Sequence, residues 1–151
     1  MVDWCLDNAP PSSSPSILEV GSGNGTLLFG LLEAGYAPST LAGIDYSPGA
    51  VKLARQIAST KDGDDIMFSE CDFLNDTPKT LPGVEGVEVW DVVLDKGTYD
   101  AIALGDKDAE GRSPAAKYPS RVARVLKPGG YFLITCAFLF SQSTGLSHLV
   151  R

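Results

Sequence analysis

Short apolar runs alternate with amphipathic stretches along most of the chain, with glycine, proline or polar residues between them. Residues 17–20 form the first apolar run, and residues 26–34 after it place leucines at helical spacing. Further runs predict strands at 43–45, 66–73, 90–94 and 131–135. This alternation favours an α/β fold with a doubly wound, mainly parallel sheet. We expect one domain over residues 1–151, with its core at 16–135 and an atypical tail at 136–151.

A helix is well marked after the second apolar run. Ser47 is a suitable N-cap and Pro48 suits the first helical position. Val51, Ala54 and Ala58 then share one face, which predicts a helix packed against the sheet.

Proline and glycine mark the ends of other elements. A helix should run to Leu126, but Pro119 lies inside it, so this helix either starts or bends there. Residues 75–88 hold too many prolines and glycines for a good helix. Residues 126–130 indicate a helix stop followed by a turn into the last apolar run.

The loop after the first apolar run carries the clearest functional signal. Gly21, Gly23 and Gly25 let the chain turn sharply and let a ligand approach the backbone. Asp45 ends the second run, where its carboxylate can accept hydrogen bonds from ribose hydroxyls. Three glycines alone can also be a tight turn, but with Asp45 at this spacing they favour a pocket for a nucleoside-bearing ligand.

The glycine spacing and Glu19 indicate which nucleoside. Loops that bind nicotinamide dinucleotides normally read G-x-G-x-x-G, whereas this loop reads G-x-G-x-G after Glu19. A carboxylate here repels a pyrophosphate and suits a ligand with positive charge. S-adenosylmethionine carries a sulfonium and an ammonium beside its adenosine. We therefore expect this ligand rather than the cofactor of a dehydrogenase.

Asp72 and Phe73 follow the third predicted strand. Asp72 can accept from an adenine amino group, and Phe73 can border the ring. With these residues, the chain from about Ser16 to Thr135 resembles the class I S-adenosylmethionine-dependent methyltransferases, which have a Rossmann-like fold. The order and spacing of the segments carry this resemblance.

The string from Asp95 to Ile102 reads D-K-G-T-Y-D-A-I and is the second informative segment. We expect Asp95 at the end of a central strand, facing the donor's methyl group and orienting an acceptor amine, with Tyr99 as a wall of the channel. Alternatively, Asp95, Lys96 and Asp100 cap a turn and pair with one another.

This string, together with G-I-D-Y-S-P at 43–48, resembles the eukaryotic family that methylates a lysine of translation elongation factor 1-alpha. The resemblance implies a monomeric enzyme that converts S-adenosylmethionine to S-adenosylhomocysteine without a metal. It places Asp95 and Tyr99 at the methyl-transfer position. It also implies that the donor is bound by Glu19, Gly21, Ser22, Gly23, Asp45, Tyr46, Asp72 and Phe73.

The chain also departs from that family. Five strands are predicted, whereas the family adds two more that form a hairpin at the sheet edge. A chain truncated after its fifth strand would leave an apolar, unpaired edge and would allow self-association there. Two alternatives stay open for this reason: a non-catalytic module that binds the donor or a partner, and a methyltransferase for a small molecule.

The composition of the chain argues against several classes of partner: nucleic acid, metal ions and membranes. The chain has 12 basic and 19 acidic residues, a net charge of −7, which disfavours nucleic acid. Three widely separated cysteines and one histidine predict free buried thiols and leave no metal site to propose. The longest apolar run, at 131–140, is too short to span a bilayer, and we see no signal peptide, so we expect a cytoplasmic protein.

Overall fold

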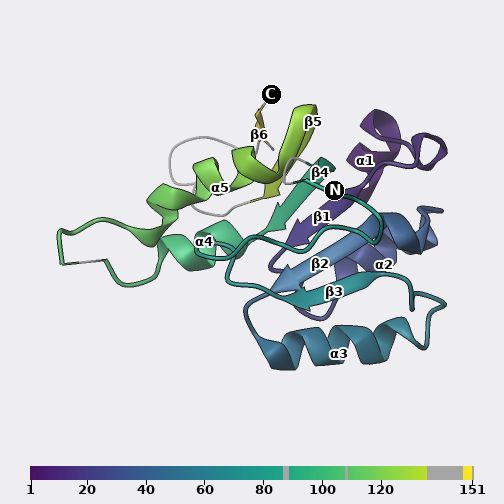
Figure 1. Cartoon of the computed structure of the whole chain (residues 1–151), viewed down its shortest axis with the longest axis horizontal. Coiled ribbons are helices and arrows are strands. Elements are labelled where there is room, and N and C mark those ends of the chain that lie inside the picture. The colour runs from purple at the N-terminus through teal and green to yellow at the C-terminus, as the bar shows by residue number, and fades with distance from the viewer. Residues whose placement is uncertain (87–88, 108, 136–147, 151) are drawn as a thin grey trace.

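A computed structural model of the chain describes residues 1–86, 89–107, 109–135 and 148–150. Within these residues six strands form one sheet in the order β3-β2-β1-β4-β5-β6 (Figure 1). All neighbours pair in parallel except β5 and β6, which are antiparallel. The strands are β1 Ile17–Val20, β2 Leu41–Asp45, β3 Met67–Glu70, β4 Trp90–Lys96, β5 Leu126–Thr135 and β6 His148–Val150.

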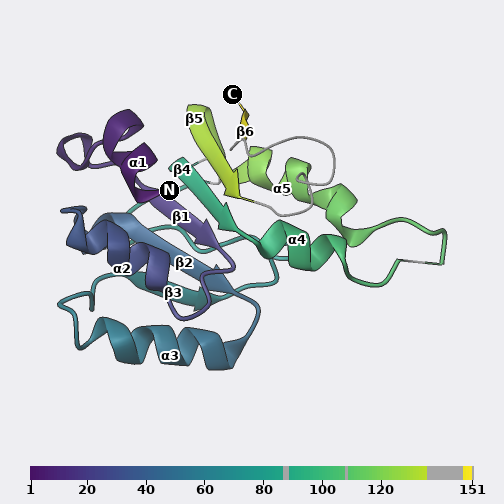
Figure 2. The same cartoon turned by 180° about the vertical axis from the view of Figure 1, so that it is seen from behind.

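Helices cover the two faces of the sheet (Figure 2). They are α1 Val2–Asn8, α2 Thr26–Glu33, α3 Pro48–Ala58, α4 Thr98–Ala103 and α5 Tyr118–Val125, with single 3₁₀ turns at Pro11–Ser13, Pro38–Thr40 and Pro114–Lys117. One apolar cluster joins α1, α2 and α3 to one face, and a second joins α5 and the segment after β3 to the other. The predicted doubly wound, mainly parallel α/β fold is confirmed.

Local signals set several of these elements correctly. Ser47 caps α3 by accepting a hydrogen bond from the Ala50 N–H at 3.4 Å, and Pro48 is the first helical residue. Pro119 lies in the first turn of α5, so this helix starts there instead of bending. The third strand is shorter than the predicted 66–73, because the chain turns beyond Glu70 and the Asn75 N–H bonds the Asp72 carbonyl at 2.9 Å.

The expectation of an unpaired fifth strand is wrong. Residues 132–134 of β5 pair with β6, in the register Phe132 to Val150, Leu133 to Leu149 and Ile134 to His148. Strand β6 thus occupies the part of the sheet edge where an unpaired β5 would have allowed self-association. Residues 136–147 of the tail, with Cys136, lie outside the described residues. The other two cysteines, Cys5 and Cys71, are free and buried as predicted.

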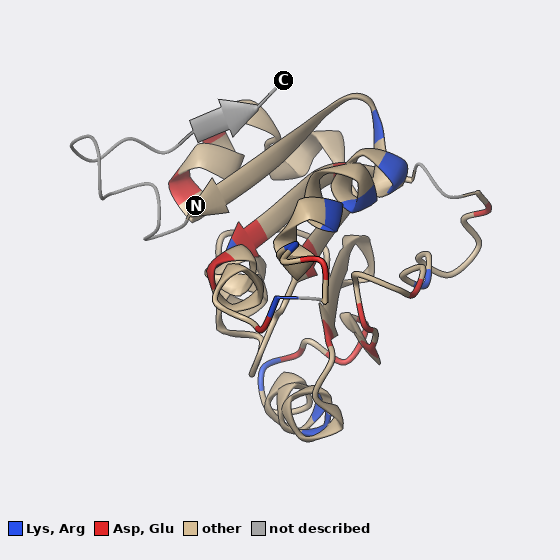
Figure 3. Cartoon of the chain, turned by 90° about the vertical axis from the view of Figure 1, so that its left-hand side faces the viewer, with Lys and Arg blue, Asp and Glu red and all other residues tan. Residues whose placement is uncertain are grey.

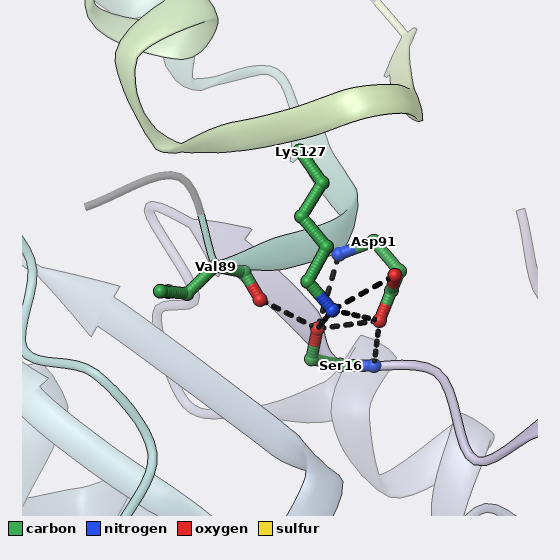
Figure 4. Close-up of polar contacts among 4 residues, drawn as sticks. All are labelled: Ser16, Val89, Asp91 and Lys127. Carbon is green, nitrogen blue, oxygen red and sulfur yellow. Dashed lines mark hydrogen bonds and ion pairs between the residues drawn. The ribbon is translucent and has the colours of Figure 1, made fainter. Parts of the chain in front are cut away.

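A polar cluster fastens the amino-terminal end of the sheet (Figure 4). The Ser16 hydroxyl donates to Asp91 Oδ2 at 2.7 Å or to the Val89 carbonyl at 2.8 Å. Lys127 Nζ lies 2.9 Å from Asp91 Oδ2. Partial burial raises the pKa of Asp91, but the hydrogen bonds from Ser16 and Lys127 outweigh it and hold this pKa below its ordinary value. The cluster joins the starts of β1, β4 and β5, at the opposite end of the sheet from the glycine loop.

Candidate functional site

A cleft of about 440 Å³ opens at the carboxyl ends of β1, β2 and β4. Ligands of doubly wound sheets bind at this end of the strands. Five of the predicted donor-site residues line it: Gly21, Asp45, Tyr46, Asp72 and Phe73. The end of β4 and the turn that leads to α4 also line it, through Lys96, Gly97 and Thr98.

The glycine loop is held against the end of β2. The N–H groups of Gly21 and Ser22 donate to the Ile44 carbonyl at 2.8 and 2.9 Å. Gly21 and Gly23 have φ values of 69° and 54°, in the region that favours glycine. The loop therefore turns sharply enough to leave its outer surface beside the cleft.

Asp45 is oriented by backbone donors on both carboxylate oxygens. The Gly23 N–H donates to Oδ2 and the Ser47 N–H to Oδ1, each at 2.9 Å. A carboxylate has about four acceptor positions, so each oxygen can accept another hydrogen bond. Asp45 is thus preorganised to bind two hydroxyls of a ligand in the cleft.

Glu19 is buried without a partner for one of its oxygens. The side chain is 4% exposed, and Oε2 has no hydrogen bond within the described part of the chain. Burial raises the pKa of Glu19 to about 8, while the positive charge of Lys96 acts in the opposite direction. Glu19 lines a second hollow of about 370 Å³, which shares Gly21 and Lys96 with the cleft. An unsatisfied buried carboxylate at this point fits a ligand that brings a positive charge.

The segment after β3 forms the floor of the cleft. Phe73 is 5% exposed and its ring packs edge-on against Tyr118, with the centroids 5.2 Å apart. Arg121 on α5 donates from Nε to the Phe73 carbonyl at 2.8 Å. Figure 3 shows how the basic residues (blue) and the acidic residues (red) are distributed over the chain. Asp72 is exposed at the rim, and the Tyr46 side chain is 80% exposed.

Asp95 does not face the cleft as predicted. Its side chain is fully buried and lines neither hollow. Its carboxylate accepts from the Thr98 N–H at 2.8 Å, the Tyr99 N–H at 3.0 Å and the Tyr118 hydroxyl. The alternative that Asp95 caps a turn is therefore the one that the geometry matches. Burial raises the pKa of Asp95, and these hydrogen bonds act in the opposite direction.

Tyr99 also lies away from the cleft. Its ring packs edge-on against Tyr118, with centroids 5.5 Å apart, in the apolar cluster under α5. It is not among the residues that line the cleft, so the expectation that it walls a channel is not met. Ala101 and Ile102, the next turn of α4, line the cleft in its place.

A family model described as a methyltransferase domain matches residues 11–144. The chain belongs to the methyltransferase-domain family. It is 40% identical over 147 residues to "Protein-lysine N-methyltransferase efm4" of Schizosaccharomyces pombe, covering 89% of this chain and 59% of that protein. It is 37% identical over 135 residues to "EEF1A lysine methyltransferase 2" of Mus musculus, covering 89% of this chain and 50% of that protein. The chain thus spans about half to three fifths of the length of these relatives.

A solved structure confirms the methyltransferase fold. The glycopeptide N-methyltransferase MtfA, in complex with S-adenosylmethionine, superposes with a TM-score of 0.62 at 18% identity. The match covers 87% of this chain and 50% of MtfA. At this identity the likeness concerns the fold, and it confirms the predicted Rossmann-like class.

The structural roles of two residues, Thr98 and Tyr118, were not predicted from the sequence. Thr98 lines the cleft and bonds the end of β1, and Tyr118 donates to Asp95. Thr98 lies inside the D-K-G-T string, which was a usable signal. Tyr118 shares one helical stripe with Val122 and Val125, which marks it as a core residue, but nothing in the stripe indicates Asp95 as its partner.

The described residues contain no group of histidine, cysteine or acidic side chains placed to hold a metal ion. Of the helices in the described ranges, none has the length and apolar character that a bilayer crossing requires.

Proposed function

We propose that the protein is an S-adenosylmethionine-dependent protein-lysine N-methyltransferase and that its substrate is translation elongation factor 1-alpha. Relatives at 37 to 40% identity over 89% of this chain carry the names protein-lysine N-methyltransferase and EEF1A lysine methyltransferase. One observation in the structure carries the donor assignment: Glu19, whose Oε2 has no hydrogen bond among the described residues, lies at a glycine loop that leads to the oriented Asp45. Such a substrate would place the protein in the cytoplasm.

The donor site follows from the cleft. Asp45 would bind the ribose, Asp72 and Phe73 would border the adenine, and Glu19 would face the positive charge. The remaining proposed donor-site residues are Gly21, Ser22, Gly23 and Tyr46. When bound, S-adenosylmethionine supplies an electrophilic methyl group that leaves S-adenosylhomocysteine behind. The proposed methyl transfer uses no metal ion.

The acceptor must reach the cleft as a neutral amine. Bringing a lysine from a pKa near 10.4 to neutral pH costs about 4–5 kcal/mol, at 1.36 kcal/mol per unit. Lys96 lines the cleft, and its positive charge disfavours the ammonium form of an incoming lysine there. The cleft therefore favours the neutral form of an incoming lysine and holds it near the donor.

Two linked measurements test the proposal. The first is calorimetric titration of the chain with S-adenosylhomocysteine, beside Asp45→Ala and the matched control Glu33→Gln. Glu33 is exposed and pairs with Lys61, away from the cleft. We expect Asp45→Ala to weaken binding by roughly tenfold to a hundredfold, from about 1.5–3 kcal/mol per charged hydrogen bond, and Glu33→Gln to have no effect.

The second measurement is methylation of elongation factor 1-alpha, read by mass spectrometry of its lysine peptides. Methyl transfer that Asp45→Ala reduces would support the substrate. Donor binding without transfer to this factor would contradict the proposed substrate and favour the non-catalytic module, because the chain spans only part of its relatives. Loss of donor binding in the wild-type chain would overturn the donor site itself.

A further inference from the structure

Thr98 joins the β4–α4 turn to the end of β1 and to the glycine loop. Its hydroxyl donates to the carbonyl of Val20, the last residue of β1, at 2.9 Å. A Cβ at Gly21 would lie 1.9 Å from Thr98 Oγ1, so the glycine loop and the β4–α4 turn are as close as a glycine allows. Gly21 and Thr98 both line the cleft. The separation of its walls therefore depends on this contact.

Asp95 holds Thr98 in that position. The Thr98 N–H donates to Asp95 Oδ1 at 2.8 Å, and the Tyr99 N–H donates to Oδ2 at 3.0 Å. These are the first two backbone donors of α4, which otherwise lacks a side-chain cap. The Tyr118 hydroxyl, from the start of α5, fastens the same carboxylate from the other side. Asp95 also lies opposite Val20 in the register of β1 and β4.

We propose that Thr98 and Asp95 are positioning residues for donor binding: Thr98 sets the separation of the glycine loop from the β4–α4 turn, and Asp95 acts through Thr98. In this proposal Asp95 does not contact the acceptor amine directly, and the proposal rests on the donor site given under the proposed function. The Asp95 carboxylate is fully buried and accepts hydrogen bonds from three donors. Contact with a substrate lysine would therefore require Asp95 to give up its bonds to the first turn of α4.

The Thr98 part is tested by binding. Thr98→Val keeps the shape of the side chain and removes its hydrogen bond, so the dissociation constant for S-adenosylhomocysteine should rise roughly two- to tenfold. Thr98→Ser keeps the hydroxyl and should bind like the wild type. Thr80→Val is the matched control, because the Thr80 hydroxyl also bonds a carbonyl, that of Val84 at 2.7 Å, outside the cleft. Unchanged binding by Thr98→Val would overturn the proposal.

The Asp95 part is tested by separating kcat from binding. Asp95→Asn keeps Oδ1 for the Thr98 N–H but sets an amide N–H against the Tyr99 N–H that Oδ2 accepts, so donor affinity should fall while kcat at saturating donor stays within about threefold of the wild type. Asp95→Ala removes both oxygens and should weaken donor binding further. A fall in kcat on the order of a hundredfold in Asp95→Asn, at unchanged donor affinity, would instead make Asp95 a catalytic residue.

These outcomes are separable from those of the proposed function. If the chain binds S-adenosylhomocysteine but methylates no elongation factor, the Thr98 variants still report through binding. A wild-type chain that binds no donor overturns the proposed function, whereas equal donor binding by the wild type and Thr98→Val overturns the role of Thr98 alone. Amide hydrogen exchange reports the contact between Thr98 and the glycine loop without ligand. Faster exchange at residues 21–25 in Thr98→Val than in Thr80→Val would support the contact, and equal rates would overturn it.

Discussion

Donor binding should release a proton from Glu19. Burial raises the pKa of this carboxyl to about 8, and the charges of Asp95 and Asp45 add to the rise. Below that pH the ligand-free protein therefore holds Glu19 neutral. A ligand ammonium beside the carboxyl favours the ionised form, so the proton leaves as the donor binds. Binding is then linked to pH through this one group.

The magnitude follows from the linkage. When binding releases one proton, the dissociation constant falls about tenfold per pH unit below the pKa, at 1.36 kcal/mol per unit, and levels off near pH 8. Between about pH 6 and about pH 8 the affinity for S-adenosylhomocysteine should therefore rise by up to roughly a hundredfold. Glu19→Gln should bind more weakly at about pH 8 and show a flat profile.

Calorimetry in buffers of different ionisation enthalpy measures this directly. The slope of the observed enthalpy against the buffer enthalpy gives the number of protons released. We expect close to one proton for the wild type at about pH 6.5 and none for Glu19→Gln. Glu33→Gln is the control, because Glu33 lies away from the cleft and its loss should change neither the affinity nor the proton release. A wild-type affinity that is independent of pH, with no proton released, would refute the reasoning.

The raised pKa of Glu19 also makes the free energy of unfolding depend on pH. Between about pH 4.3, the ordinary value, and the raised value near 8, the folded state binds more protons than the unfolded state. The contribution of Glu19 to stability is thus fully present below the lower value and is lost as pH rises towards 8. Glu19→Gln should remove this loss, which reaches on the order of 3 kcal/mol at neutral pH, as measured by urea unfolding of the ligand-free chain.

Three further perturbations give distinct outcomes. Gly21→Ala places a Cβ against Thr98 at a φ of 69°, so it should lower both the melting temperature and the affinity for S-adenosylhomocysteine. Asp91→Asn should destabilise the chain by less than about 1 kcal/mol at neutral pH, because the ion pair of Asp91 with Lys127 is two-fifths exposed. The pKa of Asp91 is lowered in the folded state, so the difference in unfolding free energy between variant and wild type, measured with urea, should vanish as pH falls through that pKa. Ser47→Ala removes the cap of α3 and should cost about 0.5–1 kcal/mol by the same measurement, and an equal loss in Ser59→Ala would show that the cap contributes nothing of its own.

The glycine-loop end of the cleft was predictable because its signals are local. Gly21 and Gly23 adopt the positive φ that the glycine spacing suggested, and Asp45 ends the strand beside them. Ser47 and Pro48 begin a helix through bonds within a few residues. The pairing of β6 with β5 was not predictable in this way, because it joins Ile134 to His148 across an intervening segment.

The pattern of strands predicts where Asp95 lies along its strand, but it does not predict which face of the sheet the side chain occupies. Its place at the end of a central strand was predicted correctly, but a strand end has two faces. Val92 and Leu94 pack towards α1, α2 and α3, whereas Val93 packs towards α5, and alternation puts Asp95 on that second face. There a buried carboxylate needs donors, and one of them is Tyr118, 23 residues further along the chain. Lys96, on the opposite face, lines the cleft instead, so in the D-K-G-T string the lysine and the threonine border the cleft while the aspartate holds the threonine through its N–H.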